Sequence, residues 1–270
     1  MSCSSSRARN PIRKATHRLA IEVKVKLYSI AISHPARAAG LMLRYKGIEH
    51  EIVDILPGMQ RALLRLHGFR GATVPAMKID GRKVQGSLNV SRALEELQPE
   101  PPLFPSDPQQ RAAVEEAERW GEAELQPVPR NIFRWFVTRD YELRRNLAET
   151  SGMPLPALAG RLTKPVGWYF AHVVSGASEE SVRSELAGLP AQLDRVDELL
   201  AEGVIGNEQP NAADFQIATS IRLLHSCPQL QALIDDRPAA ELATRIAPNF
   251  GLPVPLQIPA EWVPEPVLSS

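Results

Sequence analysis

The feature that most constrains the fold of this chain is a short stretch, residues 71–87, that combines a proline turn, a hairpin and a helix start. Pro75 opens a β-prone run. Because proline cannot donate to a central ladder, it is expected at the first residue of a strand or at an edge, in some proteins after a cis bond. Asp80 and Gly81 separate two such runs and predict a two-residue hairpin, since type I′ turns need positive φ at both central positions. Ser87 stands where a helix N-cap is expected.

The residues before this stretch alternate between strand and helix patterns. Residues 23–28 alternate apolar with polar side chains and predict a strand, and residues 36–46 carry apolar side chains at helical spacing. Residues 49–55 repeat the strand pattern, and residues 59–67 follow a proline–glycine break as a second helix. The predicted element order over residues 23–97 is therefore β-α-β-α-β-β-α, the order of an α/β domain.

Proline content divides the remainder of the chain. Residues 98–108 hold five prolines and predict a semi-rigid linker at a domain boundary. Residues 109–247 lose the β signal, so an all-helical domain is expected there. Residues 248–270 are again rich in proline and predict an extended tail. Residues 1–22 carry arginines and serines, as transit peptides do, but no apolar core, and they predict a disordered basic leader.

Composition excludes several classes of protein. The 270 residues are 44% hydrophobic and 23% charged, which excludes disorder of the whole chain. The 31 Lys and Arg balance 31 Asp and Glu, so nothing global favours nucleic acid or a membrane, although a local basic patch stays possible. Cys3 and Cys227 give neither a disulfide framework nor metal-ligand spacing, which is typical of a reducing cytoplasm. No run reaches the roughly 18 apolar residues of a membrane span.

A second helix start is marked in the helical half. Asn211 predicts an N-cap whose side-chain oxygen accepts from the third helical residue, and Asp214 can reach back to the cap amide. Because plain capping already accounts for both residues, we expect them to be structural and not catalytic.

Taken together, these features resemble one family. The element order, the Val74–Pro75 turn, the helix start at Ser87, the proline-rich linker and the capped helix after Asn211 are similar to the glutathione transferase superfamily over about residues 23–245. The resemblance implies a thioredoxin-like domain with a cis bond at the proline turn, followed by a helical bundle domain. It also implies a cytoplasmic homodimer.

The resemblance further implies where glutathione binds. Thr73, Val74 and Pro75 would form the turn in which the backbone of Val74 meets the cysteinyl part of the tripeptide. Ser87 would hold the γ-glutamyl carboxylate, which agrees with the attraction of helix N-termini for anions. Gly86 would adjoin the same group, although family members usually carry Glu, Gln or Asp at this position.

The catalytic candidate comes from the same comparison. Ser33 falls where Ser-type and Cys-type members keep the residue that meets the sulfur, and its hydroxyl would donate to the thiolate. The alternative is an ordinary helix N-cap, and one serine can do both. His34, next to it, is expected to be exposed and inert, with a general base as the alternative. Tyr28 is expected to be a half-buried strand residue and not a catalytic tyrosine.

The predicted function is that of a glutathione transferase, which joins the glutathione thiolate to a hydrophobic electrophile, with glutathione as co-substrate and no further cofactor. The wall for the electrophile is expected from residues 112–120 and from the region of Phe133, Trp135 and Phe136, although aromatic side chains at this spacing more often lie in a core. The glycine at position 86 leaves two alternatives open. One is a transferase that uses another thiol, and the other is a non-catalytic binding or scaffolding protein on the same fold.

Overall fold

The four strands of the described residues form one mixed sheet. The computed structural model describes residues 23–174, 176–251 and 256–264, so the leader predicted at residues 1–22 lies outside the described residues. Strand β1 pairs in parallel with β2 and antiparallel with β3, which in turn pairs antiparallel with β4, so the strand order is β2-β1-β3-β4. The strands are β1 (Val25–Ser29), β2 (His50–Asp54), β3 (Ala76–Ile79) and β4 (Arg82–Gln85).

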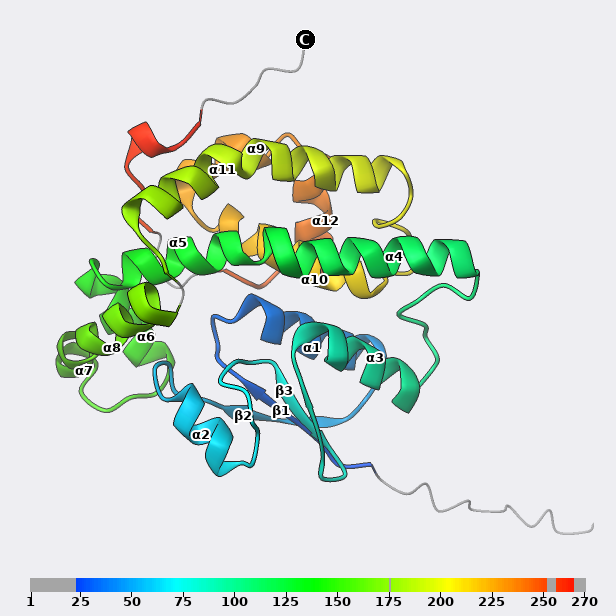
Figure 1. The fold of residues 1–270 in the computed structure, drawn as a ribbon, viewed down its shortest axis with the longest axis horizontal. Helices are drawn as coiled ribbons and strands as arrows, with labels where there is room; N and C mark the ends of the chain where they lie inside the picture. Colours follow the sequence, from blue (N-terminus) through cyan, green and yellow to red (C-terminus); the bar gives the residue numbers. More distant parts are fainter. Residues whose placement is uncertain (1–22, 175, 252–255, 265–270) are drawn as a thin grey trace, which may run out of the picture.

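Helices cover both faces of this sheet. Figure 1 shows α1 (His34–Tyr45) and α3 (Ser87–Leu97) on one face and α2 (Gln60–Leu66) on the other. The alternation of β1 explains the two layers, because Leu27 is buried in the main core with α1 and α3 while Tyr28 is buried in a smaller cluster with Leu64. The thioredoxin-like βαβαββα order predicted from sequence is confirmed. The expectation for Tyr28 was wrong, because aromatic contacts bury its ring almost completely, at 2% exposed.

The hairpin that joins β3 to β4 has the backbone that its sequence predicts. Asp80 has a φ of 48° and Gly81 a φ of 87°, the positive values that a tight hairpin turn needs. The Asp80 carboxylate also accepts a hydrogen bond from the backbone N–H of Lys24 at 2.9 Å. The turn is thereby tied to the start of β1.

The helical part begins after a packed linker. Leu103 and Phe104 of the proline-rich segment are buried, and the carbonyl of Leu103 accepts from the N–H of Ala212 at 2.9 Å. Lys46 at the end of α1 is fully buried, and its Nζ donates to Glu95 at 2.7 Å and to the carbonyl of Pro101 at 2.8 Å. The linker is therefore fixed to both the sheet domain and the helices.

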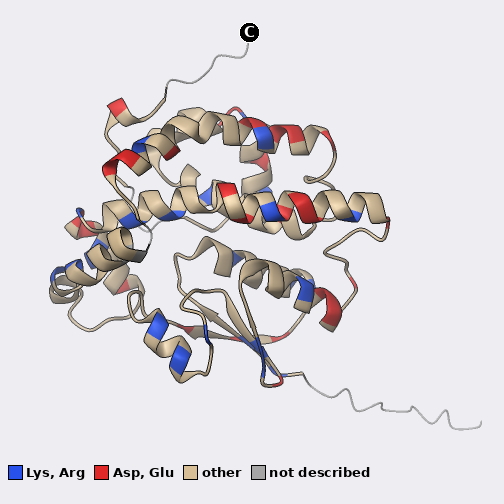
Figure 2. Ribbon diagram, viewed as in Figure 1, with Lys and Arg blue, Asp and Glu red and all other residues tan. Residues whose placement is uncertain are grey.

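Nine α-helices follow in the described residues, together with two π-helical segments and one 3₁₀ turn. They are α4 (Pro108–Trp120), η1 (Gly121–Leu125), α5 (Pro127–Val137), α6 (Tyr141–Thr150), α7 (Pro156–Leu162), α8 (Lys164–Trp168), η2 (Tyr169–Val174), α9 (Glu179–Ala201), α10 (Ala212–His225), α11 (Pro228–Ile234), α12 (Pro238–Ile246) and η3 (Ala260–Trp262). Charged residues of both signs are spread over their outer faces (Figure 2). None of the helices in the described ranges has the length and hydropathy to cross a bilayer.

Two helix boundaries differ from the sequence pattern. Apolar periodicity predicts one helix over residues 131–150, but α5 ends at Val137 and α6 begins after Asp140, whose carboxylate accepts from the N–H of Leu143 at 3.0 Å. The next helix, α7, starts with Pro156 and lies between the two helix-prone stretches of the sequence, residues 131–150 and 166–174. The capping side chain of Asp140 sets the start of α6, whereas α7 has no side-chain cap and starts with a proline at its first position.

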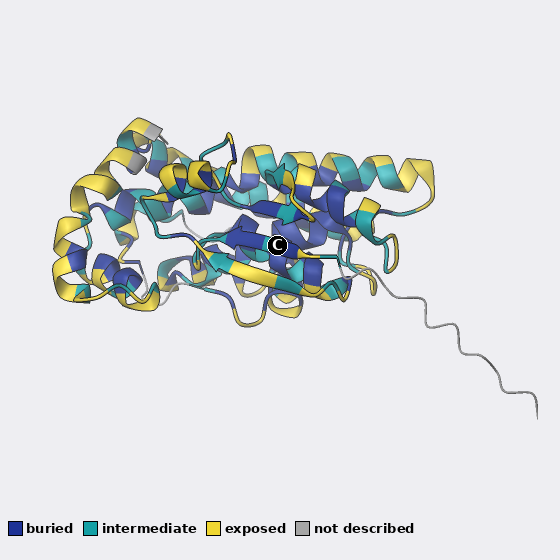
Figure 3. Ribbon diagram, turned by 90° about the horizontal axis from the view of Figure 1, so that it is seen from below, coloured by how far each residue is buried: buried dark blue, intermediate teal, exposed yellow. Residues whose placement is uncertain are grey.

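Helix α10 is the centre of the helical domain. It packs against α1 of the sheet domain and against α4 and α12, and nearly all of its residues are buried. Figure 3 shows the buried residues gathered in the middle of the molecule. At its start, Asn211 Oδ1 accepts from the N–H groups of Ala213 and Asp214 at 3.0 and 3.2 Å, and Asp214 Oδ2 accepts from the N–H of Asn211 at 2.8 Å. In the C-terminal segment beyond it, Leu256 and Ile258 are buried.

Candidate functional site

A cavity of about 370 Å³ lies between the sheet domain and the helical domain. Its lining includes every residue for which the sequence suggested a catalytic or glutathione-binding role, and these come from the loop before α1, the turn before β3 and the start of α3. They are Ser33, Thr73, Val74, Pro75, Gly86 and Ser87. Segments more than fifty residues apart in the chain therefore meet in one place.

Ser33 is the N-cap of α1. Its Oγ accepts from the backbone N–H of Ala36 at 3.3 Å, and its own N–H donates to the carbonyl of Ile30 at 2.8 Å. A hydroxyl carries one donor in addition to two acceptor lone pairs, so capping uses an acceptor and leaves the proton to donate elsewhere. The half-buried Ser33 can thus cap the helix and still donate into the cavity.

The turn before β3 contains a cis peptide bond between Val74 and Pro75. The carbonyl of Pro75 accepts from the N–H of Gly86 at 3.0 Å, which ties the turn to the end of β4. The side chain of Gln85 adds two further ties, because its Oε1 accepts from the N–H of Gly71 at 3.0 Å and its Nε2 donates to the carbonyl of Thr73 at 2.8 Å. The sequence pattern did not reveal this bracing role of Gln85.

The start of α3 differs by one residue from the expectation. Gly86 is the N-cap, with a φ of 92°, and Ser87 is the first helical residue, not the cap. Gly86 supplies no side chain to cap the helix, and its backbone conformation is one that side chains disfavour. Ser87 is buried, and its Oγ accepts from Nε2 of Gln126 at 3.4 Å. The helix start is therefore in direct contact with the helical domain.

His34 is buried, contrary to the exposed position expected from sequence. Its Nε2 lies 3.2 Å from the carbonyl oxygen of Gln126, and since a carbonyl only accepts, Nε2 carries the proton. Burial, with the positive charge of Arg130 as a smaller cause, lowers the pKa of His34 to about 3. The imidazole is therefore neutral at physiological pH and joins the two domains, and so low a pKa makes it a weak base.

Three arginines line the cavity, two on α5 and Arg144 on α6. Arg130 and Arg134 are one helical turn apart, and both line the cavity. Burial lowers the pKa of both, to about 10 for Arg134, so both remain cationic at neutral pH. Glu122 is an acidic residue of the lining and balances part of this charge. The cavity is therefore suited to an anionic group.

The apolar wall differs in part from the expectation. Phe133 and Val137 of α5 line the cavity, but Trp135 and Phe136 face the core. None of residues 112–120 is among the cavity lining: Val114 and Ala117 of α4 are packed in the core, and the opposite face of the helix is exposed. Further apolar lining comes from α6 and α8, which the sequence did not indicate.

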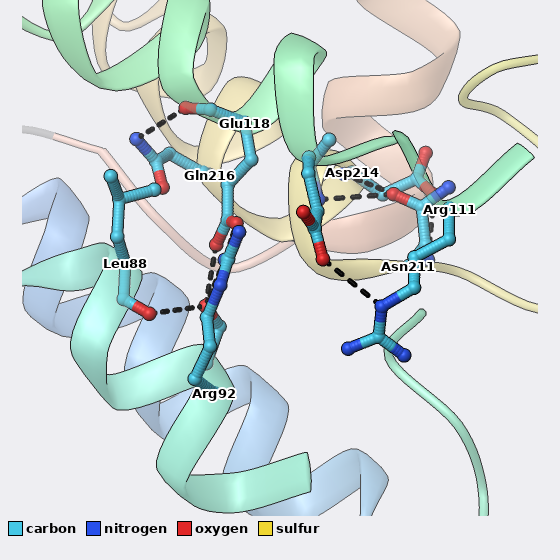
Figure 4. Close-up of polar contacts among 10 residues, drawn as sticks. Leu88, Arg92, Arg111, Glu118, Asn211, Asp214 and Gln216 are labelled. Atoms are coloured by element: carbon cyan, nitrogen blue, oxygen red, sulfur yellow. Dashed lines mark hydrogen bonds and ion pairs between the residues drawn. The ribbon is translucent and has the colours of Figure 1, made fainter. Parts of the chain in front are cut away.

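A buried polar network beside the cavity fixes α3 on α4 (Figure 4). The carboxylate of Glu118 is fully buried, accepts from Ser91 Oγ at 2.6 Å and pairs with the guanidinium of Arg92. The backbone carbonyl of Glu118 accepts from Nε2 of Gln216 at 3.3 Å. One residue of α4 thus contacts α3 in the sheet domain, about one turn after its start, and α10 in the helical domain.

The described residues contain no group of three or more His, Cys, Asp or Glu side chains placed to hold a metal ion. Cys227 is buried, and burial raises the pKa of its thiol to about 12. This thiol is therefore protonated at neutral pH and has no part in the cavity chemistry.

Comparison with known proteins relates the sheet domain to one family. Residues 27–102 match the family model described as glutathione S-transferase, N-terminal domain. Maleylacetoacetate isomerase of Mus musculus is 39% identical over 92 residues, which are 33% of this chain and 43% of that protein. The enzyme of the same name from Rattus norvegicus is 39% identical over 95 residues, 34% of this chain and 44% of that protein. These matches span less than half the length of the curated relatives.

Solved structures extend the likeness to the whole body. A glutathione S-transferase from Sinorhizobium meliloti covers 83% of this chain and 87% of its own, with a TM-score of 0.56 and 17% identity. A maleylacetoacetate isomerase from Anaeromyxobacter dehalogenans, solved with bound GSH, covers 85% of this chain and 92% of its own, with a TM-score of 0.52 and 19% identity. At these identities the likeness shows a shared fold, that of a thioredoxin-like domain followed by helices.

Proposed function

The chain belongs to the glutathione transferase superfamily, and on that premise we propose that it is a glutathione-dependent enzyme in which Ser33 stabilises the thiolate of glutathione for attack on a small electrophile. The observation that carries the proposal is the meeting of Ser33, the cis turn at Val74–Pro75 and Ser87 around one cavity. Each is a common local feature, but their convergence is specific.

The backbone around the turn suits a peptide ligand. The first ladder pair of β3 joins Ala76 to Tyr28, so Val74 precedes the paired strand. Its N–H and C=O can therefore pair with an extended peptide, as in recognition by strand addition. At the other end, α3 is an eleven-residue helix, and its N-terminal dipole with the Ser87 hydroxyl would bind a carboxylate.

The chemistry requires a thiolate. A thiol with a pKa near 8.5 is only a few per cent ionised at pH 7, and each unit by which the pKa falls corresponds to about 1.4 kcal/mol. A hydrogen bond from Ser33 favours the charged form, and so do the positive charges of Arg130 and Arg134. A drop of one or two units would make the thiolate abundant, after which its sulfur forms a thioether and the leaving group departs with its electron pair.

The test compares two serine caps. Ser33→Ala removes the cap of α1 and the proposed donor, while Ser178→Ala removes the cap of α9, which is exposed and outside the cavity. Both should lower stability by about 1 kcal/mol. Only Ser33→Ala should reduce conjugation of an aryl halide with glutathione and move its pH profile to higher pH. Equal activity of Ser33→Ala and the parent protein would refute the role of Ser33.

A second candidate reaction is the glutathione-dependent isomerisation of an unsaturated carboxylic acid. The relatives named maleylacetoacetate isomerase suggest it, and Arg130 and Arg134 offer two cations for carboxylates. In this reaction the thiolate adds to the double bond, the bond rotates, and the thiolate leaves, so glutathione is not consumed. Turnover of maleylacetoacetate without loss of free thiol would favour isomerisation over conjugation.

Because position 86 is a glycine, the experiment must also separate the two remaining alternatives, a transferase that uses another thiol and a non-catalytic binding protein. Calorimetry with glutathione should give saturable heat and a rise in melting temperature, since a ligand that binds the folded state stabilises it. Saturable binding without turnover of either substrate would favour a binding protein on this fold. The absence of heat at millimolar glutathione would favour another thiol.

A further inference from the structure

One end of the helical domain exposes an unusual amount of apolar surface. Of the ten large apolar side chains that are exposed among the described residues, seven lie between residues 155 and 173. We call this group the α7–η2 surface, after the elements that carry it. Its most prominent members are Leu155, Leu158, Leu162, Trp168, Tyr169 and Val173. Scattered apolar residues are normal on a surface, but such a concentration of them in one segment points to an interaction site.

Packing explains why these side chains point outward. Helix α7 contacts α6 through Ala159 and Gly160, which are buried. A Cβ on Gly160 would lie 2.9 Å from the backbone nitrogen of Arg145, so the two helices approach at backbone distance. The large side chains are left on the opposite face, where Leu155 is 70% and Leu162 is 68% exposed. Both views place these helices at one end of the molecule (Figures 1 and 3).

The charged residues of this segment have one sign, although the neighbouring helix α6 also presents exposed acids. Residues 150–178 contain no Asp or Glu, although the whole chain has 31 acidic residues. The segment carries Arg161 and Lys164, and both side chains are exposed. Trp168 is 54% exposed beside them. Leucines, amphipathic aromatic rings and cations without acids form the composition of helices that lie in a membrane interface.

We propose that the α7–η2 surface docks this protein on an anionic lipid surface, where it lies in the interface without crossing the bilayer. Leu158 and Leu162 enter the boundary of the acyl chains, Trp168 lies at the level of the head groups, and Arg161 and Lys164 pair with anionic lipids. A second copy of this chain is a poorer occupant, because a symmetric contact would bring the cations of both copies together.

Docking through this surface would bring the lipid close to the cavity. Thr163, Val166 and Gly167 belong to the same segment and also line the cavity. An apolar compound dissolved in the lipid would therefore be delivered next to the site. The docking itself does not depend on the proposed chemistry, since it is measured without glutathione or turnover.

The test is flotation of the full chain with lipid vesicles. Vesicles with about one third phosphatidylserine should carry the protein, phosphatidylcholine vesicles should carry much less, and added salt should release it. Leu158→Glu/Leu162→Glu should lower the partition coefficient at least about ten-fold. Arg161→Gln/Lys164→Gln should lower it about five-fold for each charge removed. All four side chains are exposed, so the fold should be retained.

The control is Ile52→Glu, which places one such charge on an exposed apolar residue of β2. It should leave vesicle binding unchanged. The proposal is overturned if the parent protein does not float with anionic vesicles, or if the control loses binding as the leucine variant does. It is also overturned if light scattering shows a dimer that Leu158→Glu/Leu162→Glu dissociates, because the surface is then an interface between copies.

Discussion

The side-chain oxygen of Gln85 accepts a hydrogen bond from the backbone N–H of Gly71 at 3.0 Å, and the same side chain donates to the carbonyl of Thr73 at 2.8 Å. One glutamine on β4 thus holds both ends of the segment that leads into the cis turn. Its side chain positions the backbone that would meet the tripeptide, so its effect on a ligand would be indirect.

We therefore expect Gln85→Ala to weaken glutathione binding in calorimetry and to lower the free energy of unfolding by about 1–2 kcal/mol, since each hydrogen bond contributes about 1 kcal/mol. The control is Gln231→Ala, which removes one exposed bond to the carbonyl of His225 on the far side of the helical domain. If both variants bind glutathione as the parent protein does, Gln85 has no positioning role.

Gly86 offers a test of why the usual acidic or amide side chain is missing. Its φ of 92° and ψ of 148° lie in a region that is almost restricted to glycine, and side chains there cost about 2 kcal/mol. Space does not oppose a side chain, because a Cβ would meet only Asn89 Nδ2, at 3.8 Å. We expect Gly86→Gln to lower the free energy of unfolding by about this amount in urea titrations.

Gly188→Ala is the matched control for this strain. Gly188 lies inside α9, and no atom lies within 4 Å of an added Cβ. This replacement should raise the free energy of unfolding by about 0.5–1 kcal/mol, since alanine favours a helix over glycine. A Gly86→Gln variant as stable as the parent protein would mean that the backbone relaxes to a conformation that side chains tolerate.

The sequence predicted the sheet domain well because its signals are local. The Asp80–Gly81 turn needs positive φ, and the alternation in β1 assigns Val25 and Leu27 to one face. The candidate glutathione-binding residues could be predicted for the same reason, because each has a definite place in the order of strands and turns. The division between α5 and α6 was missed, although Asp140 is a normal N-cap residue and a local signal for it.

The parts that were missed depend on contacts between distant segments. His34 is buried by Gln126, which is 92 residues away in the chain. Arg130 and Arg134 belong to an amphipathic helix, and only the packing of the two domains decides that they line a cavity. Periodicity gives the faces of a helix but not the neighbour of each face, so these residues carried no signal in the sequence.

The depressed pKa of His34 predicts a pH dependence of stability. The pKa is about 6.5 in the unfolded chain and about 3 in the folded protein, where the neutral form is favoured by burial. The contribution of His34 to the free energy of unfolding is therefore complete above pH 6.5. It is lost as the pH falls toward 3, because the unfolded chain takes up a proton that the folded protein does not. In that window, His34 alone should lower the free energy of unfolding by up to about 1.4 kcal/mol for each pH unit of acidification.

His34→Gln should remove this part of the slope, although a glutamine amide can still donate to the carbonyl of Gln126. The measurement is the free energy of unfolding in urea at pH 7.5 and at pH 5, for the parent protein and the variant. The parent protein should lose more stability than the variant between the two values. Equal losses would show that His34 becomes protonated in the folded state.

The contact of Glu118 with Ser91 and Arg92 predicts how firmly the two domains are joined. The Glu118 carboxylate is fully buried, and Ser91 Oγ donates to it at 2.6 Å. Glu118→Gln keeps the size of the side chain but removes the charge opposite Arg92, which is partly buried. We expect the free energy of unfolding to fall by about 2 kcal/mol, since removing one partner of a buried pair leaves the other uncompensated.

Glu116→Gln is the control, because it makes the same change on the same helix. Glu116 pairs with Arg119 at 2.6 Å, but its side chain is 68% exposed, and such surface pairs contribute little. This variant should change the free energy of unfolding by less than about 0.5 kcal/mol. Because Glu118 fixes α3 on α4, Glu118→Gln should also weaken binding at the α3 start. If the two variants are equally stable, the buried pair does not join the domains.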